Sequence, residues 1–328
     1  MSAVAQISKT LRGSGPVNWA FVFPGQGAEF IGMGEDYCKS IAIASKCFGV
    51  ASDRMGVDLR AIMARGPART LAQAEIAQPV VFTMSFVIAS LLVERGITPS
   101  SVAGHSLGQF AAVTVAGALD FSSALDLVIA RGQYLQACNK QVNGGMMAVD
   151  QLSRDVIQAT IAESNSELWI SNFNAPSQCV VSGRKPALWQ LKKELDRQGG
   201  NCRWLNVPGP AHSPLMKIAA DRLSVKLESM SFRDPQMPVL ASASGLPLTD
   251  AGAIRAELRS HMLMPVNWVA VLQKLLEHGT RLIEAGPGRV LKGLALRNAW
   301  QSRCLLTSTL KDFEESLSTI EEAATCAL

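Results

Sequence analysis

Short apolar runs alternate with longer stretches of helical spacing through much of the chain. Trp19–Phe23 and Ser101–Ala103 are compact apolar segments that end at glycine-containing turns, as buried strands do. Apolar positions recur at helical spacing in four stretches, residues 33–48, 79–94, 109–118 and 122–138. Two later strands are predicted near Pro238–Ala241 and Arg281–Glu284. Strands alternating with helices indicate a doubly wound α/β domain built on a parallel sheet.

The middle of the chain follows a different order of elements. Strands are predicted at Met146–Val149, Leu168–Phe173, Gln178–Ser182 and Cys202–Val207, with helices at residues 153–165 and 186–198. This β-α-β-β-α-β order is typical of a ferredoxin-like unit. We therefore expect residues 141–208 to form a small subdomain inserted into a large α/β domain made of residues 18–140 and 209–305. Residues 1–17 are expected to form a leader, and residues 306–328 a C-terminal tail.

Composition narrows the classes of protein that fit this pattern. The 328 residues are 48% hydrophobic and 18% charged, which suits a folded protein of enzyme size. A net charge of +4 without a basic stripe argues against a nucleic-acid binder. The seven cysteines are scattered and form no C-x-x-C pair, so we expect neither disulfides nor a zinc site, and a cytoplasmic location.

Neither the N-terminus nor the most apolar segment indicates a membrane. Residues 1–17 are mixed polar and lack the apolar core of a secretory signal. The apolar stretch Pro79–Leu92 is shorter than a bilayer span and is interrupted by Thr83, Ser85 and Ser90. We therefore expect no membrane-spanning segment.

A G-x-S-x-G motif, Gly104-His105-Ser106-Leu107-Gly108, lies between a predicted strand and a predicted helix. This is the setting of a nucleophile elbow, a sharp turn that exposes a serine at the end of a strand in hydrolase-like α/β domains. The helix that follows would direct its N-terminal N–H groups toward a developing oxyanion. A chance match in a loop that contains glycine and serine is the alternative interpretation, and the strand-turn-helix context argues against it.

A serine nucleophile needs a base, and the chain contains four histidines. His105 is next to Ser106, but adjacent side chains on an elbow point apart. His278 lies at a predicted helix C-terminus, where a capping role is the simpler interpretation. His212 lies in a proline-rich loop between a predicted strand and a predicted helix, where α/β sites are built, so it is the best candidate for the base. An ordinary histidine of a surface loop is the alternative.

Nine short motifs occur in the order found in one enzyme family. They are Phe21–Gly27, Ala77–Pro79, Gly104–Gly108, Arg131-Gly132, Gly145–Ala148, Asn172–Pro176, His212–Met216, Pro265-Val266 and Glu284–Gly288. In this ordered set, which spans about residues 19–292, the chain resembles the malonyl-CoA:acyl carrier protein transacylase family. That family includes the acyltransferase domains of polyketide and fatty acid synthases. Its fold, a hydrolase-like α/β domain with a ferredoxin-like insertion, agrees with the arrangement predicted above.

The resemblance implies a role for each matching residue. Ser106 would be acylated, and His212 would be its base, oriented by the backbone carbonyl of His261. Gln26 and the backbone N–H of Leu107 would form the oxyanion hole. Arg131 would bind the free carboxylate of a malonyl group in a bidentate pair. The other positions that match the acyl pocket are Gln78, His105, Asn174 and Ala211.

The implied function is a ping-pong transfer of a malonyl group from malonyl-CoA to the phosphopantetheine thiol of an acyl carrier protein, with no bound cofactor and no metal. Alternatives are transfer of a substituted malonyl or other acyl group, the acyltransferase subunit of a malonate decarboxylase, an acyl hydrolase, and an inactive carrier-binding scaffold. Arg131 argues against a hydrolase of simple acyl chains, unless it is a surface or helix-capping arginine. The intact Ser106, His212, Gln26 and Arg131 argue against a scaffold.

Four positions depart from the family pattern. Gln109 replaces the usual glutamate after the elbow, Glu29 replaces a glutamine, and His261 replaces a glutamine or asparagine. Ala211 precedes the base where phenylalanine or serine is commoner, and its small side chain leaves room for a substituted malonyl group. These changes bear on the identity of the acyl group rather than on the Ser–His chemistry.

Overall fold

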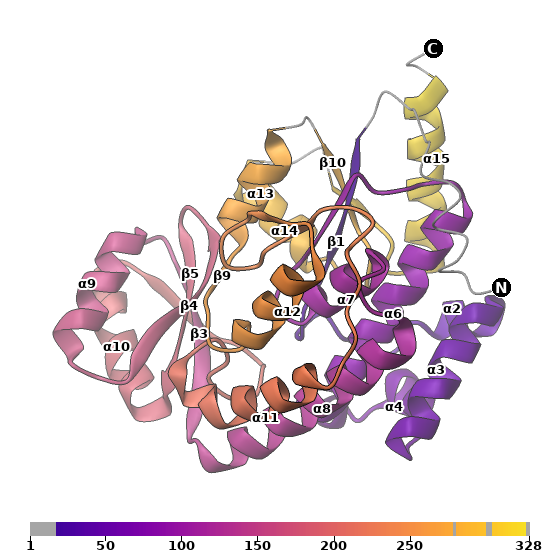
Figure 1. Cartoon of the computed structure of the whole chain (residues 1–328). Helices are drawn as coiled ribbons and strands as arrows, with labels where there is room; N and C mark the ends of the chain where they lie inside the picture. The colour runs from indigo at the N-terminus through magenta and orange to yellow at the C-terminus, as the bar shows by residue number, and fades with distance from the viewer. Residues whose placement is uncertain (1–17, 278–279, 300–303, 326–328) are drawn as a thin grey trace.

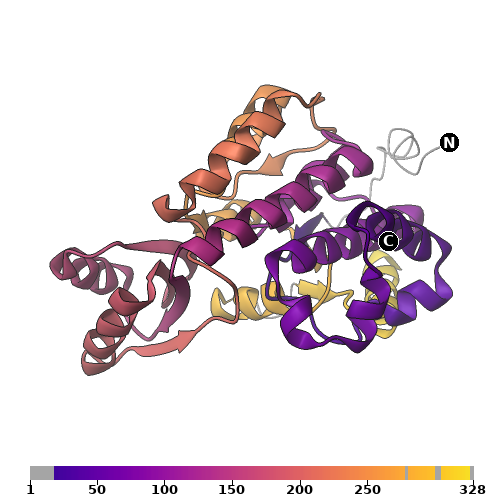
Figure 2. The same cartoon turned by 90° about the horizontal axis from the view of Figure 1, so that it is seen from below.

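The computed structural model describes residues 18–277, 280–299 and 304–325, and the predicted leader, residues 1–17, lies outside the described residues. A large α/β domain carries a smaller sheet with two helices, α9 (Arg154–Ser164) and α10 (Lys185–Arg197), set to one side of it (Figure 1). Figure 2 shows the same offset from below. The predicted fold class, a hydrolase-like α/β domain with a ferredoxin-like subdomain, is confirmed.

The large domain is built on a six-stranded sheet in the order β11-β10-β1-β2-β7-β8. Its strands are β1 (Trp19–Phe23), β2 (Ser101–Gly104), β7 (Val239–Leu240), β8 (Pro247–Leu248), β10 (Arg281–Glu284) and β11 (Cys304–Leu306). Neighbours from β11 to β7 pair in parallel, and β8 runs antiparallel to β7. All of β1 is buried, because it lies between two strands of a sheet that is covered on both faces.

Helices and turns of the large domain cover both faces of this sheet. They are α2 (Glu35–Ser40), α3 (Ala42–Met55), α4 (Leu59–Arg65), α5 (Ala68–Leu71), α6 (Ala74–Glu94), α7 (Gly108–Val115), α8 (Phe121–Gln141), η1 (Pro214–Met216), α11 (Lys217–Glu228), α12 (Ala251–Ser260), α13 (Trp268–Leu276), α14 (Val290–Arg297) and α15 (Leu310–Thr325). Phe21 and Phe23 face the core shared with α6 and α8, whereas Val22 faces the core of α13 and α14, which includes Trp268. The alternation of side chains along β1 therefore joins two apolar cores.

Burial, rather than length, identifies α6 as a core helix. The helix begins at Ala74, upstream of the predicted start at Pro79, and by length and composition it is the one helix of the described chain that could cross a membrane. However, 89% of its most apolar window is buried inside the protein. The argument that this segment is too short for a bilayer is therefore corrected: it is long enough, and its apolar surface is covered by neighbouring helices.

The small sheet has the order β6-β3-β5-β4-β9. Its strands are β3 (Gly144–Asp150), β4 (Leu168–Ala175), β5 (Gln178–Arg184), β6 (Asn201–Trp204) and β9 (Val266–Asn267). The first four pair antiparallel and, with α9 and α10, follow the predicted β-α-β-β-α-β order. The fifth, β9, comes from the later part of the chain and runs parallel to β4. The small subdomain is therefore joined to the large domain by a shared sheet as well as by the chain.

Two expectations about the large domain are corrected. The stretch 33–48 forms two helices, because the extended backbone of Ile41 separates α2 from α3. The predicted tail, residues 306–328, is part of the domain as far as the structure describes it. Leu306 belongs to β11, and α15 packs Phe313 and Leu317 into the main core. The hydroxyl of Tyr37 donates to the carbonyl of Thr307 at 2.8 Å, which fastens this segment to α2.

Candidate active site

Ser106 lies in the sharp turn between β2 and α7. Its φ of 53° falls in the left-handed region that favours glycine, so the turn holds the serine in a strained conformation. Both flanking glycines are required by space. A Cβ on Gly104 would lie 2.0 Å from the backbone of Gly108, and a Cβ on Gly108 would lie 2.0 Å from the carbonyl oxygen of Phe23. The tight elbow is therefore compatible only with glycine at the positions two residues before and two residues after the serine.

Gln109, which departs from the family pattern, fastens the elbow to the next strand. Its Oε1 accepts a hydrogen bond from the N–H of Gly104 at 3.1 Å, and its Nε2 donates to the carbonyl of Leu240 in β7 at 3.0 Å. A carboxylate could accept the first bond but could not donate the second. The amide therefore matches one buried donor and one buried acceptor, and glutamine suits this position better than glutamate would.

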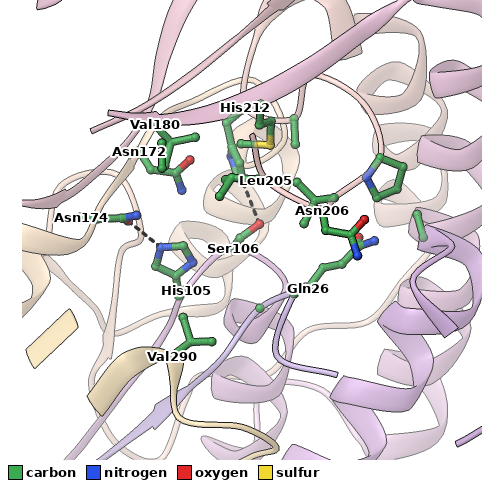
Figure 3. A pocket seen from close by; sticks show the side chains of 18 of the residues that line it. Gln26, His105, Ser106, Asn172, Asn174, Val180, Leu205, Asn206, His212 and Val290 are labelled. Carbon is green, nitrogen blue, oxygen red and sulfur yellow. Dashed lines mark hydrogen bonds between the residues drawn. The ribbon is translucent and has the colours of Figure 1, made fainter. Parts of the chain in front are cut away.

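His212 is held beside Ser106 by backbone carbonyls. The Oγ of Ser106 lies 2.7 Å from Nε2 of His212, and the two side chains point toward one another (Figure 3). Nδ1 of His212 lies 3.0 Å from the carbonyl oxygen of His261 and 2.9 Å from that of Met264. Both partners are acceptors, so Nδ1 carries the proton and Nε2 presents a lone pair to the serine. The structure therefore brings His212 next to Ser106 and the carbonyl of His261 next to Nδ1, and the role of His212 as the base stays a prediction.

Burial keeps His212 neutral. Desolvation, reinforced by the positive charge of Arg131, lowers the pKa of His212 to about 3. The pKa values of His105 and His261 are also lowered, chiefly by burial. A neutral imidazole is the form that a general base needs at neutral pH.

Arg131, on α8, is a buried cation that lines the same cavity as Ser106. It is 2% exposed, and desolvation lowers its pKa to about 9. Its Nη1 donates to Oε1 of Gln78 at 2.7 Å, its Nε has no partner, and no ion pair within the described residues includes it. Gly132 allows this placement, since a Cβ there would lie 2.6 Å from the carbonyl of Ala74 at the start of α6. A buried guanidinium without a carboxylate indicates a site for an anionic ligand.

The oxyanion hole predicted at Gln26 and the backbone N–H of Leu107 is not tested by any contact of the structure. The side chain of Gln26 donates to the carbonyl of Ala72 at 3.1 Å and accepts from Nε2 of Gln78 at 3.3 Å, so its amide is engaged elsewhere. Leu107 is the N-cap residue of α7, at the helix end where backbone N–H groups lack partners within the helix. Donation by the N–H groups of Gln26 and Leu107 stays a prediction.

The cavity has a volume of about 370 Å³ and is lined by both domains. His105 and Asn174 meet across the domain boundary, with 3.0 Å between Nε2 of His105 and Oδ1 of Asn174 (Figure 3). Ala211 packs against Met146 and other side chains of the small sheet. The predicted residues that line the cavity are Gln26, Gln78, His105, Ser106, Arg131, Asn174, Ala211 and His212. The other two, Leu107 and His261, were predicted to contribute backbone groups from outside it.

Sequence reasoning missed several residues of the site, among them Gln178, which lines the cavity, and three that contact the predicted residues. Met264 supplies the second carbonyl to His212, Trp268 packs edge-on against the ring of His105 with 5.4 Å between ring centroids, and Phe110 lies 5.3 Å from the guanidinium of Arg131. The only sequence feature that pointed to Met264 was the next residue, Pro265, which belongs to one of the family motifs. Trp268 and Phe110 fit an ordinary apolar core equally well. His278, interpreted as a helix cap, lies outside the described residues.

A serine in an elbow, a neutral histidine 2.7 Å away and an unpaired arginine in one cavity define a serine-nucleophile acyl-transfer site. The acyl transferase domain family matches residues 20–288, which is most of the chain. The chain belongs to this family and is an acyltransferase.

Relatives of known name and structure cover nearly the whole chain. It is 32% identical to the malonyl CoA-acyl carrier protein transacylase of Bacillus subtilis strain 168, over 92% of this chain and 97% of the relative. The structure of the malonyl CoA-acyl carrier protein transacylase from Coxiella burnetii matches with a TM-score of 0.88 and 32% identity, over 93% of this chain and 99% of that one. A malonyl-transacylase solved in complex with its type II PKS acyl-carrier protein matches with a TM-score of 0.87 and 33% identity, over 92% and 99%.

Proposed function

We propose that this acyltransferase moves a malonyl group from malonyl-CoA to the phosphopantetheine thiol of an acyl carrier protein, through an ester on Ser106. The observation that carries the substrate class is Arg131, whose buried guanidinium lines the cavity of Ser106 and has no carboxylate partner in the described chain. The carboxylate of a malonyl group satisfies this cation, and a bidentate pair orients the thioester toward the serine. Relatives named as malonyl transacylases support the same substrate.

In the first half-reaction, Oγ of Ser106 attacks the thioester carbon while Nε2 of His212 takes the serine proton. The carbonyls of His261 and Met264 hold Nδ1–H and stabilise the imidazolium that forms. Backbone N–H groups of Gln26 and Leu107 stabilise the negative charge on the substrate oxygen. The carbon–sulfur bond then breaks, His212 returns the proton to the thiolate, and free CoA leaves malonyl-Ser106 behind.

The second half-reaction reverses these steps on another thiol. The phosphopantetheine thiol gives its proton to His212, its sulfur attacks the ester carbon, and Ser106 leaves as an alcohol that recovers the proton. Base, oxyanion donors and the arginine supply the whole chemistry, so the proposal includes no metal and no bound cofactor.

An acyl carrier protein is the proposed acceptor because a structural relative was solved in complex with its acyl-carrier protein. We place the reaction in the cytoplasm. The six cysteines within the described residues are free, which suits a reducing compartment.

Arg131→Ala tests the carboxylate assignment. The rate constant for acylation of Ser106 by malonyl-CoA should fall by about 10²-fold or more, because a buried charged pair is lost. Acylation by acetyl-CoA, which has no free carboxylate, should change far less. Rapid quenching followed by intact-protein mass spectrometry measures both rates. Arg222→Ala, which removes an exposed arginine from α11, is the matched control and should load malonyl at the wild-type rate.

Equal losses with both substrates would remove Arg131 from the carboxylate role. A second experiment tests the identity of the acyl group and of the acceptor. The enzyme is mixed with malonyl-, methylmalonyl- and acetyl-CoA in competition, a phosphopantetheinylated carrier protein is then added, and mass spectrometry follows the acyl group. A malonyl mass that passes from enzyme to carrier supports the proposal. Preferred loading of methylmalonyl would assign a substituted malonyl group to the space beside Ala211, and release of free acid without transfer would indicate a hydrolase.

A further inference from the structure

A second polar network starts at His105 and leads away from the catalytic pair. Beyond the contact of His105 with Asn174, Nδ2 of Asn174 donates to Oε1 of Gln178 at 3.4 Å, and Nε2 of Gln178 donates to Oδ1 of Asp150 at 2.7 Å. Asn174, Gln178 and Asp150 are 8%, 6% and 7% exposed, so the network runs through the protein interior. The bond between Ser106 and His212 does not require it, so it needs an explanation of its own.

Strand register and two arginines fix the far end of the network. Asp150, the last residue of β3, pairs in register with Gln178, the first residue of β5. Its Oδ1 accepts from Nη1 of Arg297 at 2.8 Å, and its Oδ2 accepts from Nη2 of Arg203 at 3.3 Å. Arg203 lies on β6 of the small sheet, whereas Arg297 ends α14 of the large domain. The carboxylate of Asp150 therefore connects the two domains.

A second contact at the end of α14 strengthens this connection. Nδ2 of Asn298, the residue after Arg297, donates to the backbone carbonyl of Asn174 at 2.9 Å. Asn174 is thus held through its side chain by Gln178 and His105 and through its backbone by the large domain. Rotation of the small sheet relative to the elbow would break the bonds of Asn174 to His105 and to Asn298, which cross between the domains.

Asp150 determines which group donates and which accepts in each hydrogen bond of the network. A carboxylate that faces two guanidinium groups accepts at both oxygens, so Gln178 must present its NH₂ group to it. The carbonyl oxygen of Gln178 then faces Asn174, whose NH₂ donates to it. The carbonyl oxygen of Asn174 in turn faces His105, which must carry its proton on Nε2. The charge of Asp150 thereby determines the tautomer of a ring three residues away in the network.

We propose that Asp150 is a positioning residue for acyl transfer, which acts through Gln178 and Asn174 to hold His105 as the Nε2–H tautomer in one orientation beside Ser106. His105 lines the cavity next to the serine (Figure 3). Its backbone N–H donates to the carbonyl of Phe23, the last residue of β1. A fixed ring gives the acyl group one cavity shape, which is the requirement for a productive approach to Ser106. The kinetic part of this inference rests on the proposed function.

Two variants distinguish a role of Asp150 in orienting His105 from a role that only joins the two domains through Arg203 and Arg297. Asp150→Ala removes the carboxylate together with both arginine pairs. Gln178→Met interrupts the network but leaves Asp150 paired with Arg203 and Arg297. Glu167→Gln is the matched control, because Glu167 forms an exposed ion pair with Arg184 in the same subdomain, away from the cavity.

The expected result is the same loss in both variants. Each should lower the rate constant for acylation of Ser106 by malonyl-CoA about tenfold, and the double variant should be no slower than either single variant, because both changes break one network. In ¹⁵N spectra of the ring nitrogens, His105 should be a single Nε2–H tautomer in the wild type and a mixture in both variants. Glu167→Gln should resemble the wild type in both measurements.

Two outcomes would overturn the proposal. One is an unchanged His105 tautomer in Gln178→Met, and the other is losses that multiply in the double variant. If Asp150→Ala does not fold, Gln178→Met carries the test alone. The spectra need no substrate, so they judge the network even if malonyl-CoA is not the donor, and a wild type that fails to load malonyl counts against the proposed function only.

Discussion

Ser106 and His212 lie 2.7 Å apart, but different kinds of structure hold them. Ser106 is fixed by one continuous segment, residues 104–109, in which two glycines admit no Cβ and one glutamine closes the turn. His212 is fixed by the carbonyls of His261 and Met264, which lie 49 and 52 residues further along the chain. The position of Ser106 therefore depends on the identity of the residues around it in the sequence. The position of His212 depends on the path of the backbone at His261 and Met264.

This contrast predicts where the site tolerates substitution. On the serine side, a single added carbon meets backbone atoms that cannot move without disturbing β1. On the histidine side, the side chains that follow the two carbonyls can change as long as the backbone keeps its path. The following predictions test the contrast, from the largest expected effect to the smallest.

Ser106→Ala removes the nucleophile and should lower acyl transfer by about 10⁴-fold or more, because no other group in the site can form the ester. Intact-protein mass spectrometry after incubation with malonyl-CoA should show no covalent adduct. Ser164→Ala, on the exposed end of α9, is the control and should load normally. A malonyl adduct that persists in Ser106→Ala would refute the assignment of the nucleophile.

Gly108→Ala should damage the elbow without touching a reacting atom. The new Cβ would lie 2.0 Å from the carbonyl oxygen of Phe23, so the turn or β1 must shift, at a cost of about 1–3 kcal/mol in the free energy of unfolding. Acylation should fall with it, because Ser106 moves relative to His212.

Gly49→Ala provides the comparison for this variant. Gly49 lies inside α3, and a Cβ there meets no atom within 4 Å, so alanine should stabilise the helix by about 0.5–1 kcal/mol. Thermal or chemical unfolding of both variants measures the difference. If Gly108→Ala were as stable as the wild type and were acylated at the same rate, the elbow would accommodate a Cβ at this position, contrary to the prediction.

His261→Gln should change acylation less than about threefold, because the hydrogen bond that orients His212 comes from the backbone carbonyl of His261. The buried ring of His261 packs edge-on against that of His212 with 5.5 Å between centroids, but its nitrogens make no hydrogen bond. The effect of the substitution on stability should depend on pH. Burial lowers the pKa of His261 well below 6.5, so below pH 6.5 the unfolded chain binds a proton that the folded chain does not. Stability of the wild type is therefore lost as the pH falls through this range.

The difference in the free energy of unfolding between the variant and the wild type reports the protonation of His261 alone, because the other titrating groups are the same in both. Relative to the wild type, His261→Gln should gain about 1 kcal/mol in the free energy of unfolding between pH 6.5 and one unit lower, because the unfolded wild-type chain is only half protonated at pH 6.5 and the full slope of about 1.4 kcal/mol per unit is reached further down. Chemical denaturation near pH 6.5 and one unit lower measures it. A constant difference at both pH values would mean that His261 is protonated in the folded protein.

The same contrast explains what could be predicted from the sequence. The elbow is a local structure. Its glycines, its serine and the helical spacing that follows lie within a few residues of one another, so the sequence predicts both the turn and the nucleophile. The strands β1, β4 and β10 begin where their apolar runs begin, because they are buried or half-buried in ways that the alternation of side chains records. Arg131 was predicted through the family resemblance alone. His212 was already the best candidate for the base from its position in the proline-rich loop, and the resemblance added its pairing with the carbonyl of His261, which the surrounding sequence does not show.

The remainder depends on contacts between distant segments. Nothing near Asp150 or Gln178 in the sequence reveals that strand register places them opposite one another, or that Arg297 reaches the same carboxylate. β9 and β11 have only two and three residues, too few for a periodic signal, and partners in the sheet define them. Residues 306–325 were interpreted as a tail because the core position of Phe313 becomes visible only when α15 is placed against α2.

The central position of β1 has a consequence for the newly made chain. Among the described strands β1 is the first to be synthesised, but it lies between β2 and β10, so one of its edges stays unpaired until residues 281–284 have left the ribosome. The four antiparallel strands within residues 144–204 are complete long before that point. Nascent chains that lack the carbonyl of Met264 cannot hold His212 as the finished protein does. Catalytic competence is therefore gained only after residues 261–284 have been synthesised, later than the antiparallel strands of the small sheet are complete.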